Sequence, residues 1–206
     1  GGTVSRSLQP QDVYLSSATA GYCQVQELPP ELPAGTHSSS VLWAVRRLWH
    51  SLNLDSDRHG TVDWNPLGEW IRPGQRVLIK PNWVRDRHLG GDSLESLITH
   101  TSLIEAILPY VMKAKPASVV VGDAPIQGCD FHRLVRSAGV DALQQRFADL
   151  GFPFRVLDFR CVILPGREAW SNPQPGDRTP SDYVLFDLGR DSRLEEITTS
   201  RSDFRV

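Results

Sequence analysis

Two short apolar runs, rich in β-branched residues, constrain the fold of this chain more than any other feature of its sequence. The first run is Val77–Ile79, which is followed by Lys80 and a proline. The second covers residues 117–121 and is followed by a glycine and Asp123. Short apolar runs between turn residues predict buried β-strands, and a proline ends a strand because it has no N–H to donate. We therefore expect one strand to stop near Lys80 and another near Asp123.

The sequence between these two runs predicts a helix. Residues 103–108 are mostly apolar, and Ser102 and Glu105 have the spacing of a capping box. In that motif the serine caps the helix and the glutamate reaches back to the cap. We therefore expect a helix that starts at Ser102, with His100 just outside its N-terminus.

A second helical region and a third strand follow. Asp130 precedes an apolar series at helical spacing and is the expected N-cap. The phase of this series changes at Gly139, which predicts two consecutive helices, and a strand over residues 154–157 ends at Asp158. This alternation predicts an α/β fold: an open, mainly parallel sheet with right-handed crossovers and flanking helices, in a Rossmann-like three-layer arrangement.

The remaining sequence predicts an extended, irregular N-terminal arm over residues 1–37 and one α/β domain over residues 38–206. The arm is rich in proline near its end, and such segments are extended rather than helical. The domain opens with an amphipathic helix over 38–54, and 183–188 are expected to form a further strand. Because residues 204–206 look like the start of another strand, we expect the native protein to continue beyond them.

Composition excludes several classes of partner. The 206 residues include 22 Lys and Arg and 24 Asp and Glu, a formal net charge of -2, so nothing favours binding to nucleic acid or to an anionic membrane. No apolar run approaches the ~20 residues of a membrane helix, and no signal-peptide pattern opens the chain. Three separated cysteines, Cys23, Cys129 and Cys161, encode neither a disulfide framework nor an iron–sulfur or zinc cluster. A cytoplasmic protein without an iron–sulfur cluster is expected.

The ends of the predicted strands supply the candidate site. Ligands of open parallel sheets bind outside the carboxyl ends of the strands, where Lys80, Asn82, Asp123 and Asp158 fall. A lysine there can bind a phosphate or carboxylate, act as a base when desolvated, or form a structural salt bridge. An aspartate there can accept a proton, hold a sugar hydroxyl, bind a divalent metal, or bond its own backbone in a turn.

The start of the first crossover helix completes the predicted site. The helix dipole would keep His100 neutral, as an acid, a base or a metal ligand, and the amides near Ser102 can hold an anion. We therefore assign Lys80, His100 and Asp123 as catalytic. The predicted substrate-binding residues are Lys80, Asn82, Thr99, Ser102 and Gly122. Asp123 is also the predicted ligand if a divalent metal is used.

Four short motifs resemble DUF362, a family whose name stands for a domain of unknown function. They occur in the family's order: TVDWNPL at 61–67, PGQRVLIKPN at 73–82, TH at 99–100 and GDAPIQ at 122–127. The resemblance supplies a fold expectation and a site location, and it implies more sequence after residue 206. It also implies an association with polysaccharide-assembly genes. Some members carry ferredoxin-type iron–sulfur modules, but this chain lacks the cysteines for such a cluster.

Two functions from different classes remain open. The first is an enzyme acting on a small anionic substrate, phosphorylated or carboxylated, with sugar derivatives included. In it, Lys80 and the helix amides hold the anion while His100 and Asp123 move protons or position a metal. The second is a non-catalytic binding or assembly module that uses the segment with Trp64 and Trp70 together with the proline-rich arm. The sequence favours the enzyme and leaves the reaction type and the oligomeric state open.

Overall fold

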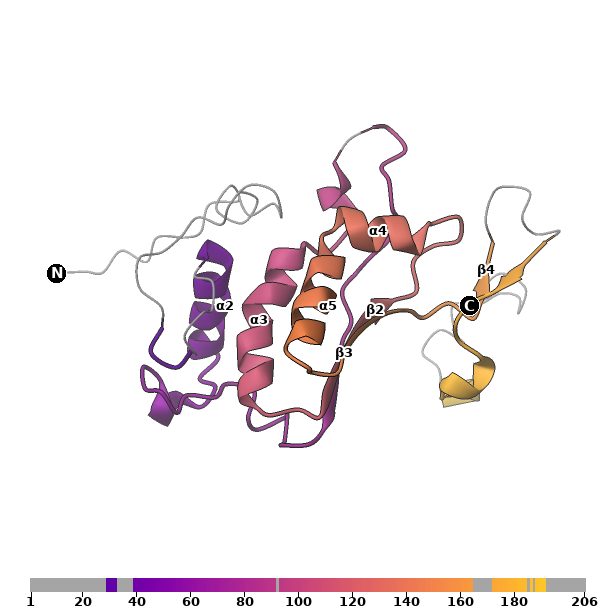
Figure 1. Ribbon diagram of the computed structural model, residues 1–206. Helices are drawn as coiled ribbons and strands as arrows, with labels where there is room; N and C mark the ends of the chain where they lie inside the picture. Colours follow the sequence, from indigo (N-terminus) through magenta and orange to yellow (C-terminus); the bar gives the residue numbers. More distant parts are fainter. Residues whose placement is uncertain are drawn as a thin grey trace.

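A three-stranded parallel sheet forms the centre of the protein (Figure 1). The computed structural model describes residues 29–32, 39–91, 93–164, 172–184, 186 and 188–191. The strands are β1 (Arg76–Ile79), β2 (Ser118–Asp123) and β3 (Phe154–Asp158), in the order β1-β2-β3. All three predicted strands are confirmed, and Asp123 and Asp158 are the last residues of theirs. Most of the predicted N-terminal arm lies outside the described residues.

Four α-helices are found in this part of the chain: α2 (Ser40–Ser51), α3 (Thr101–Lys113), α4 (Phe131–Ser137) and α5 (Val140–Asp149). The amphipathic helix predicted over 38–54 is confirmed as α2, and Ser39 caps it by accepting the backbone N–H of Leu42. Asp130 caps α4 as predicted. Gly139 separates α4 from α5 with a left-handed φ of 71°, which glycine adopts at little cost. The predicted break there is confirmed.

The start of α3 differs from the prediction. Its N-cap is His100, and the helix begins at Thr101. The Thr101 hydroxyl donates to a backbone carbonyl at the end of α4 over 2.5 Å, and this contact fixes Thr101 within the first turn. Ser102 is therefore inside the helix, and Glu105 lies 3.6 Å from Arg146 instead of reaching back to a cap. The predicted capping box is wrong.

The helices of the described chain cover only one face of the sheet. Side chains in register alternate between the two faces. One face holds the main core, whereas the other carries Leu78, which is 58% exposed. Figure 1 shows α2, α3 and α5 on the same side of the sheet. Both crossovers step in one direction, from β1 to β2 and from β2 to β3, and right-handed crossovers in one direction place their helices on one face. The α/β class is confirmed, but the second helical layer of a three-layer fold is not found among the described residues.

Two clusters of buried side chains lie on the covered face. The first fills the space between the sheet and helices α3, α4 and α5, and includes Val119, Val121, Ile104, Leu134 and Phe154. The second lies between α2 and α3, where Trp64 and Tyr110 are fully buried. Because α3 contributes side chains to both clusters, it joins the α2 layer to the sheet.

Short elements complete the described chain. β4 (Val162–Ile163) and β5 (Gln174–Pro175) pair antiparallel, and short 3-10 helices lie at Ser56–Arg58, Leu94–Ser96, Pro180–Asp182 and Gly189–Asp191. The strand predicted over 183–188 is not found at the positions of that segment that the structure describes. Among the described helices, none combines the length and the apolar composition needed to cross a membrane.

Candidate functional site

Asp123 is the most heavily bonded of the predicted site residues. It is the last residue of β2 and is only 5% exposed. Its Oδ1 accepts from Lys80 Nζ and from the Ala124 backbone N–H, both at 2.8 Å, and its Oδ2 accepts from the Trp83 backbone N–H at 2.7 Å. These bonds tie the end of β2 to the loop that follows β1. Asp123 therefore positions Lys80 and this loop, and most of its acceptor capacity is already used.

The ammonium group of Lys80 is held in place by Asp123, but the side chain is exposed to solvent. Its side chain is 60% exposed, although its ammonium group contacts Asp123. The ammonium also lies 3.4 Å from the Pro81 carbonyl, a long contact. Because an ammonium group has three N–H donors, at least one remains for an external acceptor. The predicted salt bridge and the predicted anion contact are thus compatible in one side chain.

Asn82 and Thr99 join two loops at the same edge of the sheet. The Asn82 backbone N–H donates to Thr99 Oγ1, and the Thr99 backbone N–H donates to the Asn82 carbonyl, both over 2.8 Å. A bridge between Trp83 and Ile98 continues this pairing. The segment after β1 is therefore held against the segment that leads into α3. This pairing brings His100 to the sheet edge that carries Lys80.

His100 caps α3 through its ring. Its Nδ1 accepts from the Ser102 backbone N–H at 3.2 Å and lies 2.8 Å from the Ser102 hydroxyl. Burial lowers the pKa of His100. From these contacts we assign the ring proton to Nε2, because Nδ1 acts as the acceptor. At neutral pH His100 is then a hydrogen-bond donor through Nε2. The Ser102 amide, predicted to bind an anion, is already used by this cap, and Ser102 is only 1% exposed.

Gly122 has a packing role on the sheet face that points away from the helices. A Cβ at this position would lie 2.3 Å from the Leu157 carbonyl oxygen and 2.7 Å from Cζ of Phe159. Since real Cβ atoms do not approach that closely, only glycine fits here. The space beside Gly122 is filled by the protein itself, which does not support its predicted contact with substrate.

The predicted metal role of Asp123 has little support from its surroundings. Within the described ranges, no group of three or more His, Cys, Asp or Glu side chains is arranged to hold a metal ion. The ammonium group of Lys80 already contacts Asp123 Oδ1 at 2.8 Å. A cation would have to displace or compete with that ammonium group.

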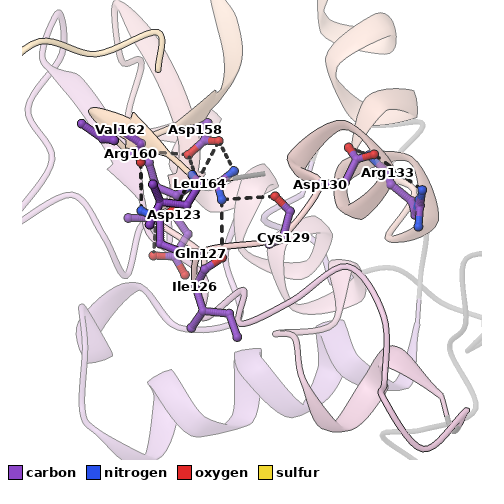
Figure 2. Close-up of polar contacts among 11 residues, drawn as sticks. Asp123, Ile126, Gln127, Cys129, Asp130, Arg133, Asp158, Arg160, Val162 and Leu164 are labelled. Carbon is purple, nitrogen blue, oxygen red and sulfur yellow. Dashed lines mark hydrogen bonds and ion pairs between the residues drawn. The ribbon is translucent and has the colours of Figure 1, made fainter. Parts of the chain in front are cut away.

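Arg160 is the residue that sequence reasoning missed (Figure 2). It is 5% exposed and pairs with Asp158: Nε lies 3.0 Å from Oδ1, and a terminal nitrogen lies 2.6 Å from Oδ2. Its other terminal nitrogen donates to the Cys129 carbonyl at 3.1 Å. Arg160 thus ties the end of β3 to the loop after β2. The available signal was an arginine two residues after an aspartate at the end of a strand.

A cavity of about 640 Å³ lies beside the Asp158–Arg160 pair, between α4, α5 and the end of β3. Its lining includes Cys129, Arg136, Asp141, Asp158 and Arg160. None of the predicted catalytic or substrate-binding residues lines it. Burial raises the pKa of the Cys129 thiol to about 12, so that thiol is neutral at physiological pH. The cavity and the Lys80 edge are two separate features at the carboxyl ends of the strands.

Comparisons with protein-family models, with curated proteins and with solved structures found no match to this chain. The resemblance of its motifs to DUF362 therefore stays a prediction. The site has to be interpreted from its own geometry.

Proposed function

We propose that this chain is an enzyme that binds a small anionic substrate, phosphorylated or carboxylated, at the carboxyl edge of its parallel sheet. The observation that carries the proposal is that Lys80 is both paired with Asp123 and exposed to solvent. Its ammonium group is held 2.8 Å from the buried Asp123 carboxylate, yet its side chain is 60% exposed. A lysine that is fixed in place and still has a free donor is suited to bind an external phosphate or carboxylate.

The neighbouring residues have distinct roles in this proposal. Asp123 positions the ammonium group of Lys80, and the exposed Asn82 side chain contacts the substrate. His100 donates a hydrogen bond to the substrate through Nε2, since its Nδ1 is engaged by the helix amide. This changes the earlier assignment: neutral His100 acts as a hydrogen-bond donor, and Asp123 acts through Lys80. We also propose that the substrate is sugar-derived, from the motif resemblance, and that the protein is cytoplasmic, from its three separated cysteines.

Ligand-dependent stability tests this function. The parent chain, Lys80→Met and Arg47→Met are each melted with inorganic phosphate, sugar phosphates and uronic acids. Arg47 is an exposed cation on α2, so its variant is a control for the loss of one positive charge. A ligand at 100 times its Kd adds about 2.7 kcal/mol to the free energy of unfolding. We expect one ligand class to stabilise the parent and Arg47→Met but not Lys80→Met. Equal stabilisation of all three proteins would contradict the proposal.

A non-catalytic binding or assembly module is the second candidate, and the exposure of Trp70 favours it. Trp70 is 56% exposed, whereas Trp64 is fully buried. Of the two indoles predicted as an interaction surface, only Trp70 is therefore available to a partner. If no anion stabilises the parent chain, this function takes precedence.

A further inference from the structure

We propose that the cavity beside the Asp158–Arg160 pair binds an uncharged, polyhydroxylated ligand of the size of a monosaccharide or a cyclitol. Its volume of about 640 Å³ lies within the range of small-molecule sites. The cavity also lies at the carboxyl end of β3, the edge at which open parallel sheets bind their ligands. This binding does not involve the ammonium group of Lys80, so it stands or falls separately from the proposed function.

A buried ion pair forms one wall of the cavity. Asp158 and Arg160 are 6% and 5% exposed, and both line the cavity. Nε and one terminal nitrogen of Arg160 donate to Asp158, and the other terminal nitrogen donates to the carbonyls of Cys129 and Ile126 (Figure 2). A guanidinium group has five N–H donors. Among the described residues, these contacts leave one N–H of the nitrogen that bonds Asp158 Oδ2 for a ligand.

Two side chains of α5 that line the cavity are each held by one atom. Gln144 Oε1 accepts the backbone N–H of Val156, and Asp141 Oδ1 accepts that of Ala142. In the described part of the chain, Gln144 Nε2 and Asp141 Oδ2 have no hydrogen-bond partner. A hydroxyl group both donates and accepts, so a polyhydroxylated ligand can bond to either atom. Because both side chains are already fixed, binding costs less conformational entropy.

The charges around the cavity disfavour an anion. The charges of Asp158 and Arg160 compensate each other. Apart from His132, the other charged lining residues are three aspartates and one arginine: Asp130, Asp141, Asp177 and Arg136. This surplus of carboxylates repels a phosphate or a carboxylate. The cavity is therefore suited to a different ligand from the anion proposed for Lys80.

Apolar side chains line the cavity as well. Phe131 and Val135 of α4, Val156 of β3 and Ile163 of β4 are each partly exposed. Small-molecule sites combine such apolar surface with a few fixed polar groups. Sugar rings and cyclitols have polar hydroxyl groups together with C–H groups, so they match a lining of this kind. A bare metal ion would leave the apolar surface unused.

The wall formed by β4 and β5 is fixed by the loop after β2. Gln127 donates to the carbonyl of Val162 and accepts the backbone N–H of Leu164 (Figure 2). Ile163 lies between these two residues. The pairing of β4 with β5 holds the segment that leads to Asp177. The cavity therefore has fixed walls on the sides of α5, β3 and β4.

Binding of uncharged probes tests the proposal. Glucose, galactose, mannose and myo-inositol are each titrated into the 206-residue chain, and binding is followed by saturation-transfer NMR. The titration extends to ~10 mM, because weak binding has dissociation constants in the millimolar range. We expect at least one probe to bind the parent chain and to bind Lys80→Met equally well. Equal binding to Lys80→Met separates this cavity from the proposed anion site.

Two pairs of α5 variants test the polar groups. Gln144→Ala and Asp141→Ala each remove one polar group of the lining, and we expect binding about threefold to tenfold weaker in each. Gln145→Ala and Asp149→Ala are the matched controls, since these two residues are exposed on the same helix and do not line the cavity. We expect both controls to bind like the parent.

Filling the cavity gives the decisive result. Arg136→Trp introduces an indole from an exposed position of the lining, and we expect it to abolish binding. Arg47→Trp makes the same change at an exposed position of α2 and is expected to leave binding intact. A parent chain that binds none of the four probes overturns the proposal. So does binding that survives in Arg136→Trp, or a parent chain that binds the diamine putrescine but no hydroxylated probe.

Discussion

At the scale of single residues, the bonding of Asp123 predicts unequal effects for the two partners of the Lys80–Asp123 pair. Asp123→Asn replaces a buried acceptor of backbone N–H groups with a group that presents donors to them. We expect a loss of about 1–3 kcal/mol in the free energy of unfolding, measured by urea denaturation. Lys80→Met removes a side chain that is 60% exposed, so we expect a loss below about 1 kcal/mol. Equal losses would contradict the assignment of Asp123 as the structural member of the pair.

The lowered pKa of His100 predicts that the stability of the protein depends on pH. Burial lowers its pKa, so the unfolded chain binds the proton more readily than the folded chain. The stability that neutral His100 provides is complete above a pH of about 6.5 and is lost as the pH falls from there through the lowered pKa. Urea midpoints at pH values of about 7.5 and about 5.5 measure the loss.

Two asparagine variants isolate the contribution of His100. His100→Asn keeps a good N-cap and is expected to reduce the loss of stability at low pH. His132→Asn changes an exposed histidine on α4 and is expected to leave the loss as in the parent. Burial also lowers the pKa of His59, which adds to the same slope in all three proteins. An unchanged slope in His100→Asn would assign the dependence to other groups.

At the scale of elements, β3 is an edge strand whose outer side is covered by a side chain. Val156 is paired with Val121 but its backbone N–H donates outward, to Gln144 Oε1 of α5 at 2.8 Å. We expect Gln144→Ala to speed hydrogen exchange of the Val156 amide, because an uncovered edge N–H faces water. The Phe159 amide, which donates to the Asp123 carbonyl within the sheet, serves as the internal control. Equal acceleration of both amides would indicate general destabilisation instead.

The elements also show which parts of the fold were predictable from sequence. The strands and the break at Gly139 were predictable because local patterns of apolar residues and glycine determine them. The arrangement of helices on the two faces of the sheet was not predictable, because it depends on which neighbouring strand each strand pairs with. The cap of α3 was misassigned because a serine three residues before a glutamate has the spacing of the capping box also when both lie inside the helix. Arg160 was missed because its bond to the Cys129 carbonyl joins residues that are distant in sequence.

For the candidate site, the rule for parallel sheets predicts a location at the carboxyl ends of the strands. Lys80 and Asp123 are in contact there, and a ligand site at this edge stays a prediction. The roles of the individual site residues could not be predicted from the sequence, because they depend on hydrogen bonds between loops. The bond of the Trp83 amide to Asp123 joins residues 40 positions apart, and no local pattern encodes it.

At the scale of the whole molecule, the segment 29–32 and the α2 layer are joined to the sheet through α3. Glu31 is 4% exposed and forms an ion pair with Arg46 of α2. It also accepts from the hydroxyl of Tyr110 at 3.3 Å, and its backbone carbonyl accepts from Lys113 Nζ at 3.0 Å. Tyr110 and Lys113 both belong to α3, whose other side packs on the sheet. Glu31 therefore connects α2 directly to α3, and through α3 to the sheet.

This connection predicts cooperative unfolding. Glu31→Ala leaves Arg46 without its carboxylate, and breaking a buried pair in this way costs about 3 kcal/mol. Arg46 keeps its contacts with Trp43 and Trp64, whose ring centroids lie 5.4 Å and 5.2 Å from its guanidinium carbon, so we expect no larger loss. Arg58→Ala removes an arginine whose side chain is 61% exposed and which pairs with Asp55. It is the control and is expected to cost less than about 1 kcal/mol.

Hydrogen exchange distinguishes a cooperative molecule from a loosely attached layer. If α2, α3 and the sheet unfold together, Glu31→Ala lowers the protection of the Val45 amide in α2 and of the Val121 amide in β2 by the same free energy. If the α2 layer opens by itself, only Val45 loses protection. We expect equal losses, because α3 buries Ile104 against the sheet and Tyr110 against α2. Opening the α2 layer would therefore expose the Tyr110 side of α3, the helix whose other side covers the sheet core.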